Sequence, residues 1–304
     1  MANEGKIAVV TGGAGFIGSH LVDELIRRGY AVRVVDNLIA GKKENIHPDA
    51  EFFKVDIRNM EALRPIMDGA TFVFHLAALP RVQYSIEQPV ETHDVNVNGT
   101  LNVLLAARDA NVKRVVYSAS SSAYGDQETM PLHEEMLAQP LSPYGLHKYI
   151  GEQYARVFSV VYGLPTVSLR YFNAYGSRFD PEGAYALVIG KFLKLRKNGE
   201  PLPVTGDGEQ TRDFTHVRDI VSANLLAAES KNVGKGEVVN IGAGREVSIN
   251  HIAKLVGGRV THIPARLEPR RTLADNTRAK KLFGWEPRVL LEDGIAELLH
   301  EWGI

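Results

Sequence analysis

The segment Ile7-Ala8-Val9-Val10-Thr11-Gly12-Gly13-Ala14-Gly15-Phe16-Ile17-Gly18 decides the fold of this chain. Its first four residues form an apolar, β-branched run of the kind that makes a buried strand. Apolar residues then recur at helical spacing as far as Ile26, and Gly29 stands where a helix C-terminal cap is expected. A strand, a glycine-rich turn and a helix in this order predict the start of a βαβ unit.

The glycines of this turn predict a binding site for a dinucleotide. Gly12 allows the tight turn, Gly15 lets the backbone approach a pyrophosphate, and Gly18 lets the helix pack closely on the sheet. The N–H groups at the start of the helix, around Phe16 and Ile17, add partial positive charge for the phosphates. The alternative is a plain strand–turn–helix whose glycines serve packing alone.

Asp36 follows the next apolar run, 31–35, and lies 18 residues after Gly18. A carboxylate at this place holds both ribose hydroxyls and repels a 2′-phosphate, so we expect NAD as the cofactor rather than NADP. Asp56 and Ile57 are candidates to bracket the adenine, although an ordinary strand end would look the same.

Apolar runs alternate with helical patterns along the first half of the chain. The runs are 7–10, 31–35, 52–55, 72–76, 114–119 and 166–170, and the clearest helices are 96–110 and 144–162. This alternation predicts an α/β fold, a Rossmann-type doubly wound parallel sheet. After about residue 175 glycine and proline become frequent, which predicts a smaller C-terminal substrate-binding lobe. We expect residues 1–175 to form the NAD-binding domain with the catalytic residues, and 176–304 mainly the lobe, with the chain crossing between them.

The end of the fourth apolar run adds further candidates. Leu76, Ala77 and Ala78 suit a dinucleotide that lies across the strand end. His75, just before them, is expected to be a core histidine rather than a catalytic one.

Tyr144 and Lys148 are one helical turn apart, so their side chains share a face of the predicted helix. The serine-rich turn at 118–122 adds Ser120 and Ser122 as candidate catalytic residues. We predict that Lys148 and an oxidised nicotinamide lower the pKa of the Tyr144 phenol from about 10 toward ~7, which makes it a base. Ser120 would bond the same substrate hydroxyl. The alternative is an amphipathic helix with a half-buried tyrosine and a surface lysine.

The composition excludes several classes of protein. Hydrophobic residues make up 44% of the 304, enough for a sizeable core, and 35 basic against 36 acidic residues argue against general nucleic-acid binding. Without cysteine, the chain has no disulfide, no thiolate nucleophile and no Cys-based zinc site. No apolar run approaches the ~18 residues that span a bilayer, and no secretory signal precedes the first strand, so we expect a cytoplasmic protein.

These motifs resemble the extended short-chain dehydrogenase/reductases, specifically the NAD-dependent nucleotide-sugar epimerases and dehydratases. The resemblance covers essentially the whole chain. It is most specific at Tyr124-Gly125-Asp126, Pro140-Leu141-Ser142-Pro143-Tyr144, 169–173, 206–214 and Ala274-Asp275. The stretch 179–185 looks most like the UDP-N-acetylglucosamine 4-epimerases.

The resemblance implies a tightly bound NAD and a redox-neutral cycle. Tyr144 would take the proton of the sugar 4-hydroxyl while hydride passes to the nicotinamide, and hydride would return to the other face of the 4-keto intermediate. Lys148 would hold the nicotinamide ribose. The other cofactor contacts implied are Ser118, Tyr171 and Phe172 beside the nicotinamide, and Asn37, Gly41 and Asn96.

The resemblance also implies a set of substrate contacts. Ser120, Ser122 and Tyr144 would lie at the sugar. Asn173 and Arg212 would contact the diphosphate. The alternative for Arg212 is a surface arginine paired with Asp213. The other contacts implied are Leu187, Val188 and Val204 at the uridine, Arg266 at the diphosphate and Glu268 at the ribose. The segment 264–269 is one residue shorter than the family pattern and lacks its glycine.

Two positions discriminate between reactions within the family. Dehydratases carry Asp-Glu where this chain has Ser121-Ser122, so dehydration is not expected. Thr272 stands at the position of the family's gatekeeper, and a small residue there leaves room for an N-acetyl group. We therefore expect interconversion of UDP-N-acetylglucosamine and UDP-N-acetylgalactosamine, and of UDP-glucose and UDP-galactose. The alternatives are epimerisation or decarboxylation of UDP-glucuronate or UDP-N-acetylglucosaminuronate, a simple sugar dehydrogenase, and a nonenzymatic NAD sensor.

The expected partners are a UDP-sugar and a second copy of the chain. By analogy with the family, helices 96–110 and 144–162 would pair across a two-fold axis in a homodimer. The basic group at 191–197 is expected to be a solvated helix face. No metal site, nucleic acid or membrane is expected.

Overall fold

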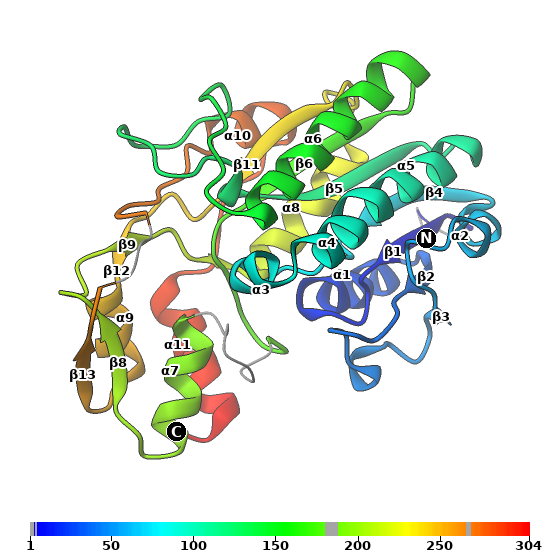
Figure 1. Cartoon of the computed structure of the whole chain (residues 1–304). Helices are drawn as coiled ribbons and strands as arrows, with labels where there is room; N and C mark the ends of the chain where they lie inside the picture. The colour runs from blue at the N-terminus through cyan, green and yellow to red at the C-terminus, as the bar shows by residue number, and fades with distance from the viewer. Residues whose placement is uncertain (1–2, 4, 180–187, 266–268) are drawn as a thin grey trace.

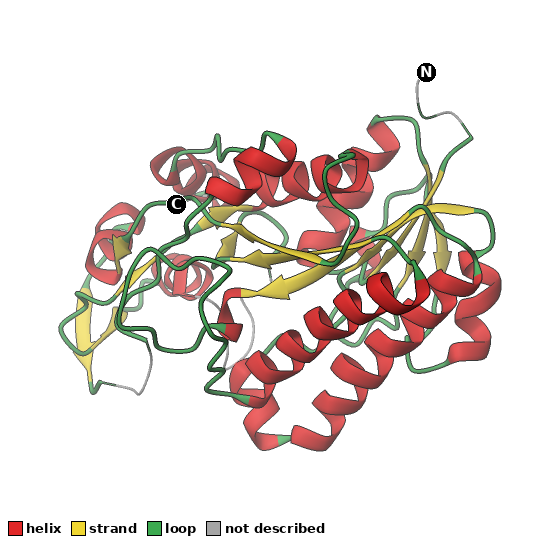
Figure 2. Cartoon of the chain, turned by 90° about the horizontal axis from the view of Figure 1, so that it is seen from above, coloured by secondary structure: helices red, strands yellow, loops and turns green. Residues whose placement is uncertain are grey.

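The computed structural model describes residues 3, 5–179, 188–265 and 269–304. Its centre is a parallel sheet of seven strands in the order β3-β2-β1-β4-β5-β6-β11. Layers of helices lie above and below this sheet (Figure 2), so the predicted doubly wound α/β fold is confirmed. The strands are β1 (Ile7–Thr11), β2 (Ala31–Val35), β3 (Glu51–Phe53), β4 (Ala70–His75), β5 (Arg114–Ser120), β6 (Thr166–Tyr171) and β11 (Glu237–Ile241).

The sheet separates two hydrophobic cores. Val10 and Phe74 pack on one side with Leu21, whereas Val9 and Val73 pack on the other with Leu104. Because both faces are buried, the central strands are apolar at every position rather than at alternate ones. The helices on the first side are α1 (Phe16–Arg27), α8 (Val217–Glu229) and α10 (Thr277–Phe283), and those on the second are α2 (Met60–Met67), α5 (Gly99–Asp109) and α6 (Pro143–Tyr162).

Helix α6 carries the predicted tyrosine and lysine, and its start is well defined. The Ser142 hydroxyl caps it by accepting a hydrogen bond from the backbone N of Gly145 (3.1 Å), and Pro143 is its first residue. A Cβ on Gly151 would lie 2.1 Å from the Tyr117 hydroxyl, so the glycine lets α6 lie close against β5. The buried face of α6 is thereby pressed onto the strand that ends in the serine turn.

Two elements differ from the sequence-based expectation. Strand β3 ends at Phe53 rather than Val55, because the chain turns and the Val55 N–H bonds the Phe53 carbonyl (2.9 Å). The helix expected at 96–110 begins as a wide turn, η2 (Asp94–Asn98), and becomes regular only in α5. Between β4 and this turn lie α3 (Val82–Glu87) and α4 (Pro89–His93), and the short helices η1 (Lys43–Asn45) and η3 (Ser121–Ala123) follow β2 and β5.

The second half of the chain contributes to both parts of the molecule. Strand β11 with α8 and α10 completes the sheet layers, whereas a separate core forms at one end of the sheet (Figure 1). That core unites α7 (Val188–Lys197), β8 (Leu202–Thr205), α9 (Ile249–Val256) and α11 (Leu291–Trp302), and the more exposed β13 (Val260–Ile263) pairs with β8. The short pairs β7 (Ala174–Tyr175) with β10 (Thr215–His216), and β9 (Thr211–Arg212) with β12 (Val247–Ser248), lie between the two parts. A domain boundary at residue 175 stays a prediction.

Candidate active site

A cavity of about 500 Å³ lies at the carboxyl edge of the sheet, between the ends of β1 and β4. From these two neighbouring strands the chain leaves toward opposite faces, which is the place where doubly wound sheets bind ligands. Most of the predicted cofactor residues line this cavity: Gly12, Gly15, Phe16, Ile17, Gly18, Asp36, Asn37, Gly41, Ile57, Leu76, Ala77, Ala78, Ser118, Tyr144, Lys148 and Tyr171.

The glycine turn leaves no room for side chains. A Cβ on Gly12, whose φ is +73°, would lie 2.7 Å from the backbone N of Ala77. A Cβ on Gly18 would lie 2.1 Å from the Gly12 carbonyl oxygen. No side chain caps the start of α1, so its first N–H groups can bond a ligand in the cavity. These features fit the pyrophosphate of a dinucleotide.

The carboxylate of Asp36 lines the same cavity at the end of β2. Its oxygens accept hydrogen bonds from the backbone N of Ala14 (3.1 Å) and of Leu38 (2.8 Å). Gly41 packs against it, because a Cβ there would lie 2.8 Å from both oxygens. Burial raises the pKa of Asp36, and the two backbone donors oppose this shift. A carboxylate fixed in this way fits the hydroxyls of a ribose.

Three predicted cofactor residues do not line the cavity and have supporting places instead. Asp56 pairs with Arg58 (2.8 Å), which lowers the pKa of its carboxyl to about 2, and accepts a hydrogen bond from the Asn37 amide (2.9 Å). The Asn96 amide bonds the backbone N and O of Leu79 (2.7 and 3.1 Å), so it fixes the loop after β4. Phe172 is fully buried in a small apolar cluster beside Tyr124. Each side chain points away from the cavity because packing or an ion pair already engages it.

The predicted catalytic residues meet at the other end of this cavity. Ser120 ends β5, and its hydroxyl lies 3.1 Å from that of Ser122. Tyr144 and Lys148 face them from α6, and all four residues line the cavity. The Lys148 ammonium donates to the Ser118 carbonyl (2.7 Å). The backbone N of Tyr144 donates to the Ser85 hydroxyl (3.0 Å), a contact that joins α3 to α6 and that no sequence pattern suggested.

Burial is the main influence on the pKa values of this group. It raises the pKa of Tyr144, and the Ser120 hydroxyl opposes the shift. The expected lowering of this pKa by Lys148 together with an oxidised nicotinamide stays a prediction. Burial lowers the pKa of Lys148 to about 8. His75 is fully buried between Thr11 (2.7 Å) and Thr100 (2.9 Å), as expected of a core histidine, and burial lowers its pKa to about 3.

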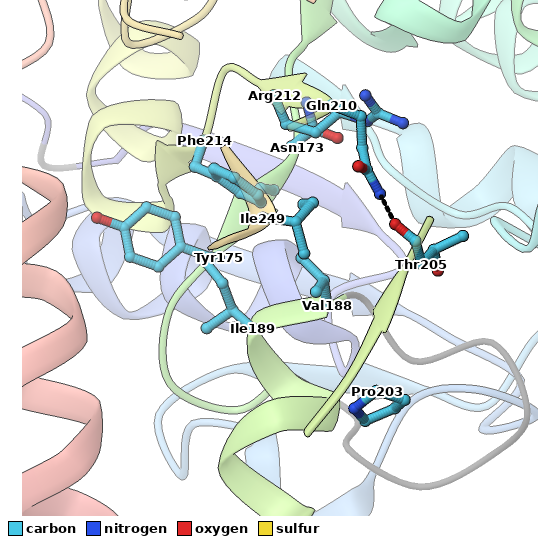
Figure 3. Close-up of a pocket in the computed structure, with 11 residues that line it drawn as sticks. Asn173, Tyr175, Val188, Ile189, Pro203, Thr205, Gln210, Arg212, Phe214 and Ile249 are labelled. Carbon is cyan, nitrogen blue, oxygen red and sulfur yellow. Dashed lines mark hydrogen bonds between the residues drawn. The ribbon is translucent and has the colours of Figure 1, made fainter. Parts of the chain in front are cut away.

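A second cavity, of about 260 Å³, lies where the lobe meets the sheet (Figure 3). Asn173 lines both cavities and therefore joins them. Its φ of +28° is unusual for a residue with a side chain, and asparagine tolerates it better than most. The predicted substrate residues Val188 and Arg212 line this second cavity. So do Tyr175, Ile189, Pro203, Thr205 and Ile249, which the sequence did not single out, and Gln210 and Phe214, which belong to the family-specific segment 206–214 but were not proposed as contacts.

Other predicted substrate residues fall elsewhere. Val204 is fully buried in the lobe's core, and its neighbours Pro203 and Thr205 line the cavity instead, because successive side chains of β8 point to opposite faces. Thr272 lines neither cavity, but its hydroxyl accepts from the Asp213 backbone N (3.3 Å) and the Asn173 amide (3.4 Å). Leu187, Arg266, Glu268 and most of the stretch 179–185 lie outside the described residues.

A buried aspartate, Asp213, stands between the lining residues Arg212 and Phe214 and ties their segment to distant parts of the chain. The Asp213 carboxylate accepts hydrogen bonds from the backbone N of Ala243 (2.6 Å), Gly244 (2.9 Å) and Ala274 (3.0 Å). Its backbone oxygen accepts from the Asn173 amide (3.0 Å). Asp213 is thus bonded within the fold rather than to the neighbouring Arg212, and burial raises the pKa of its carboxyl to about 6.

Comparison with known proteins shows the family of this chain. The model of the NAD dependent epimerase/dehydratase family matches residues 8–242. The chain belongs to this family. It is an enzyme, and its cofactor is NAD.

The chain is similar to its relatives over nearly its whole length. A Methanocaldococcus jannaschii protein with the provisional name UDP-glucose 4-epimerase is 42% identical over 302 residues, 96% of this chain and 97% of the relative. A UDP-N-acetyl-alpha-D-glucosaminuronate decarboxylase of Bacillus cytotoxicus is 33% identical over 317 residues, 96% of this chain and 97% of the relative.

Two solved structures share the fold closely. A UDP-glucose 4-epimerase from Thermotoga maritima with UDP-glucose has a TM-score of 0.93 and 40% identity, covering 98% of both chains. A UDP-N-acetylglucosamine 4-epimerase from Methanobrevibacter ruminantium, in complex with UDP-N-acetylmuramic acid, has a TM-score of 0.91 and 35% identity, covering 98% of this chain and 99% of the other.

Neither a metal-ligand cluster nor a membrane span occurs among the described residues. No group of three or more His, Asp or Glu side chains there is arranged to hold a metal ion. None of the helices there has the length and apolar character needed to cross a membrane.

Proposed function

We propose that this enzyme is a 4-epimerase of UDP-hexoses that interconverts UDP-N-acetylglucosamine and UDP-N-acetylgalactosamine, and also UDP-glucose and UDP-galactose, through a 4-keto intermediate. One observation carries the proposal. Ser120, Tyr144 and Lys148 line the 500 Å³ cavity, which we call the NAD cavity. Asn173 lines both this cavity and the second one, and so connects the two. A sugar at that junction would lie beside the tyrosine, with its nucleotide in the second cavity.

Each of these residues has a defined task. Tyr144 removes the proton of the sugar 4-hydroxyl and later returns it, and Ser120 bonds the same hydroxyl. NAD, when bound, would supply reversible hydride chemistry at the sugar carbon. Lys148 would hold the nicotinamide ribose, and its positive charge would favour the ionised form of Tyr144 once the two groups bind the same ribose and substrate. The cycle is redox-neutral and needs no outside oxidant.

The second cavity suits the nucleotide half of the substrate. Arg212 offers a planar cation for the diphosphate, and Val188 offers an apolar wall for the uracil. Because the second cavity would bind only the nucleotide half of the substrate, the 4-keto sugar can rotate and present its other face before hydride returns.

The carboxylates near the site argue against a dehydratase. Removal of water across C5 and C6 needs a carboxylic acid beside the tyrosine. Among the described residues that line the NAD cavity, Asp36 is the only carboxylate, and it lies at the end of β2, away from the serine turn that ends β5. Ser121 and Ser122 cannot take that role.

The reaction is tested by incubating the purified enzyme with a panel of UDP-sugars and identifying the products by NMR. The proposal expects a 4-epimer of each N-acetylated and plain sugar. Carbon dioxide and a pentose product from a UDP-uronate would favour the decarboxylase alternative. A stoichiometric rise in NADH absorbance would identify a simple dehydrogenase, and no turnover of any sugar would leave a nonenzymatic NAD sensor.

Acceptance of the N-acetyl group is assigned to Thr272. Thr272→Tyr should abolish conversion of UDP-N-acetylglucosamine and spare UDP-glucose, whereas equal loss of both would contradict the assignment. Thr272→Ser is the matched control, since it keeps both the small size and the hydroxyl bonded to Asp213 and Asn173.

We also propose a homodimer built around α6. This helix exposes five large apolar side chains, Leu146, Val157, Val160, Val161 and Tyr162, and α3 and α4 add Val82, Ile86 and Val90. An exposed apolar strip of this kind favours association. Light scattering at working concentration should give twice the chain mass, and a monomer would contradict the proposal.

A further inference from the structure

A buried ion pair lies beneath the catalytic lysine and has no part in the reaction as described so far. Glu152 and Arg170 form a two-pronged pair, with Oε1 accepting from Nε at 2.8 Å and Oε2 from an Nη at 2.7 Å. Glu152 is fully buried, and Arg170 is 3% exposed. Pairs this deep contribute little net stability against apolar replacements, so their presence calls for another explanation.

The pair lies next to Lys148. Glu152 is one turn beyond Lys148 on α6, and both belong to the buried face of that helix. Arg170 comes from β6, on which α6 packs. Its guanidinium also lies 4.4 Å from the centre of the Tyr124 ring, and the Tyr124 hydroxyl donates to Asn240 on β11 (2.7 Å). The guanidinium that bonds the carboxylate is therefore itself held in place, by Tyr124 after η3 and, through Tyr124, by β11.

Lys148 needs a nearby negative charge. It is 4% exposed, and its ammonium bonds a neutral carbonyl, Ser118 O, at 2.7 Å while lying 5.2 Å from the centre of the Tyr117 ring. Burial favours the neutral amine and lowers the pKa of Lys148 to about 8, whereas the charge of Glu152 raises it. Without that carboxylate the lysine would lose its proton at a lower pH.

The other charged or titratable groups around Lys148 do not replace Glu152. His75 on β4 is neutral, because burial lowers its pKa to about 3, and burial raises the pKa of Tyr117 on β5 and of Tyr144 on α6. The acidic groups on the helices packed against α6 already have partners near the surface, namely Glu87 with Gln83, Glu91 with Tyr84, Asp94 with Arg58 and Asp109 with Arg108. The rings of His147 and His93 contact each other.

We propose that Glu152, oriented by Arg170, is a positioning residue that keeps Lys148 protonated, so that the lysine can act on the tyrosine and the cofactor ribose. The inference rests on the proposed function for its kinetic test alone. Glu152 touches neither cavity, so it acts through Lys148.

The test is Glu152→Gln in the holoenzyme, with kcat/KM measured on the UDP-sugar from pH 6 to 10. The substitution keeps the size of the side chain and removes its charge. The alkaline limb should move to lower pH by about one unit, and activity at pH 8 should fall roughly fivefold while activity at pH 6 changes little. Glu152→Asp keeps the charge and should restore the position of the limb, even if the protein melts earlier.

The control is Glu134→Gln. The Glu134 side chain is 4% exposed and bonds the backbone N of Asn240 (2.8 Å), but it does not contact the lysine. The Glu134→Gln variant should be less stable, but the alkaline limb of its pH profile should stay in place. A purely structural role for Glu152 would reduce activity equally at every pH, and that result would overturn the inference.

A direct readout separates this inference from the proposed function. The 13Cε resonance of Lys148 is the lysine signal that is missing from the NMR spectrum of Lys148→Met. Its pH titration reports the protonation of Lys148 whether or not a substrate turns over. Its titration should move to lower pH in Glu152→Gln, and an unmoved titration would refute the inference. If the single variant does not fold, Glu152→Gln with Arg170→Gln gives a neutral hydrogen-bonded pair, in which the same downward shift is expected. A parent enzyme inactive on all UDP-sugars would refute the proposed function alone.

Discussion

The two cavities are built in different ways. The NAD cavity is lined largely by residues at the ends of β1, β2, β4 and β5 and in the turns after them, and α6 adds Tyr144 and Lys148. The second cavity gathers residues from β7, α7, β8, β9 and α9, and the segment that carries Arg212 and Phe214 is tied by Asp213 to partners 30, 31 and 61 residues away. Parallel strands bring their turns to one edge automatically, whereas the second cavity depends on a few long-range contacts. We therefore expect the chemistry to take place in the first cavity and the second cavity to contribute mainly substrate affinity.

The largest expected effect is that of Tyr144→Phe. Loss of the proton acceptor should lower kcat by about a thousandfold or more, because general base catalysis contributes ~10²–10⁴. NAD should remain bound, which is checked by its release on denaturation. Near-normal turnover would place the chemistry outside the NAD cavity and break the comparison.

Gly18→Ala should come next. A Cβ 2.1 Å from the Gly12 carbonyl forces the turn apart, and we expect a loss of about 3 kcal/mol in the free energy of unfolding, with weaker retention of NAD. Gly163→Ala is the control. Its φ is +68° and nothing lies within 4 Å, so only the backbone strain is added, ~1 kcal/mol. Equal effects on melting and NAD retention would show that the turn does not need its close approach.

Asp213→Asn tests the second cavity. The side-chain NH2 of asparagine cannot accept a hydrogen bond from a backbone N–H, so the segment beside the second cavity should loosen at a cost of ~1–3 kcal/mol. KM for the UDP-sugar should rise about tenfold, with kcat and bound NAD unchanged. Asp207→Asn, in the same lobe but exposed and paired with Arg270, should change nothing. A fall in kcat with KM unchanged would contradict the division between chemistry and affinity.

The same residue predicts a pH dependence. The pKa of Asp213 is raised to about 6 by burial, so the carboxylate is ionised above that pH and takes up a proton below it. Protonation turns one acceptor into a donor, and KM in the parent enzyme should therefore rise as the pH falls below about 6. Asp213→Asn should show no such rise, and a parallel rise in both proteins would assign it to another group.

The smallest effects compare Val204 with Thr205. Val204→Ala should cost about 2 kcal/mol of stability, because it opens a void in the lobe's core, and should leave KM nearly unchanged. Thr205→Ala should change KM a few-fold with little effect on melting, since the side chain lines the cavity. The reverse pattern would show that β8 has the register expected from the sequence.

The sequence by itself determined six of the seven strands of the sheet, the glycine turn and the placement of Tyr144 and Lys148 on one helix face, but not the edge strand β11. Those features are local: a strand, its turn and its helix lie within thirty residues, and helical periodicity places Lys148 one turn from Tyr144. Glu152 follows at the same spacing, so its place was also readable, although its partner Arg170 was not.

Only the tertiary structure decided which side of β8 faces the cavity, that Asn96 and Phe172 support rather than line the site, and that Asp213 ties the segment beside the second cavity to distant parts of the chain. It also showed that burial raises the pKa of Tyr144 and lowers that of Lys148. The physical reason is that burial and hydrogen bonding between distant segments depend on packing in three dimensions, which leaves no periodic trace along the chain.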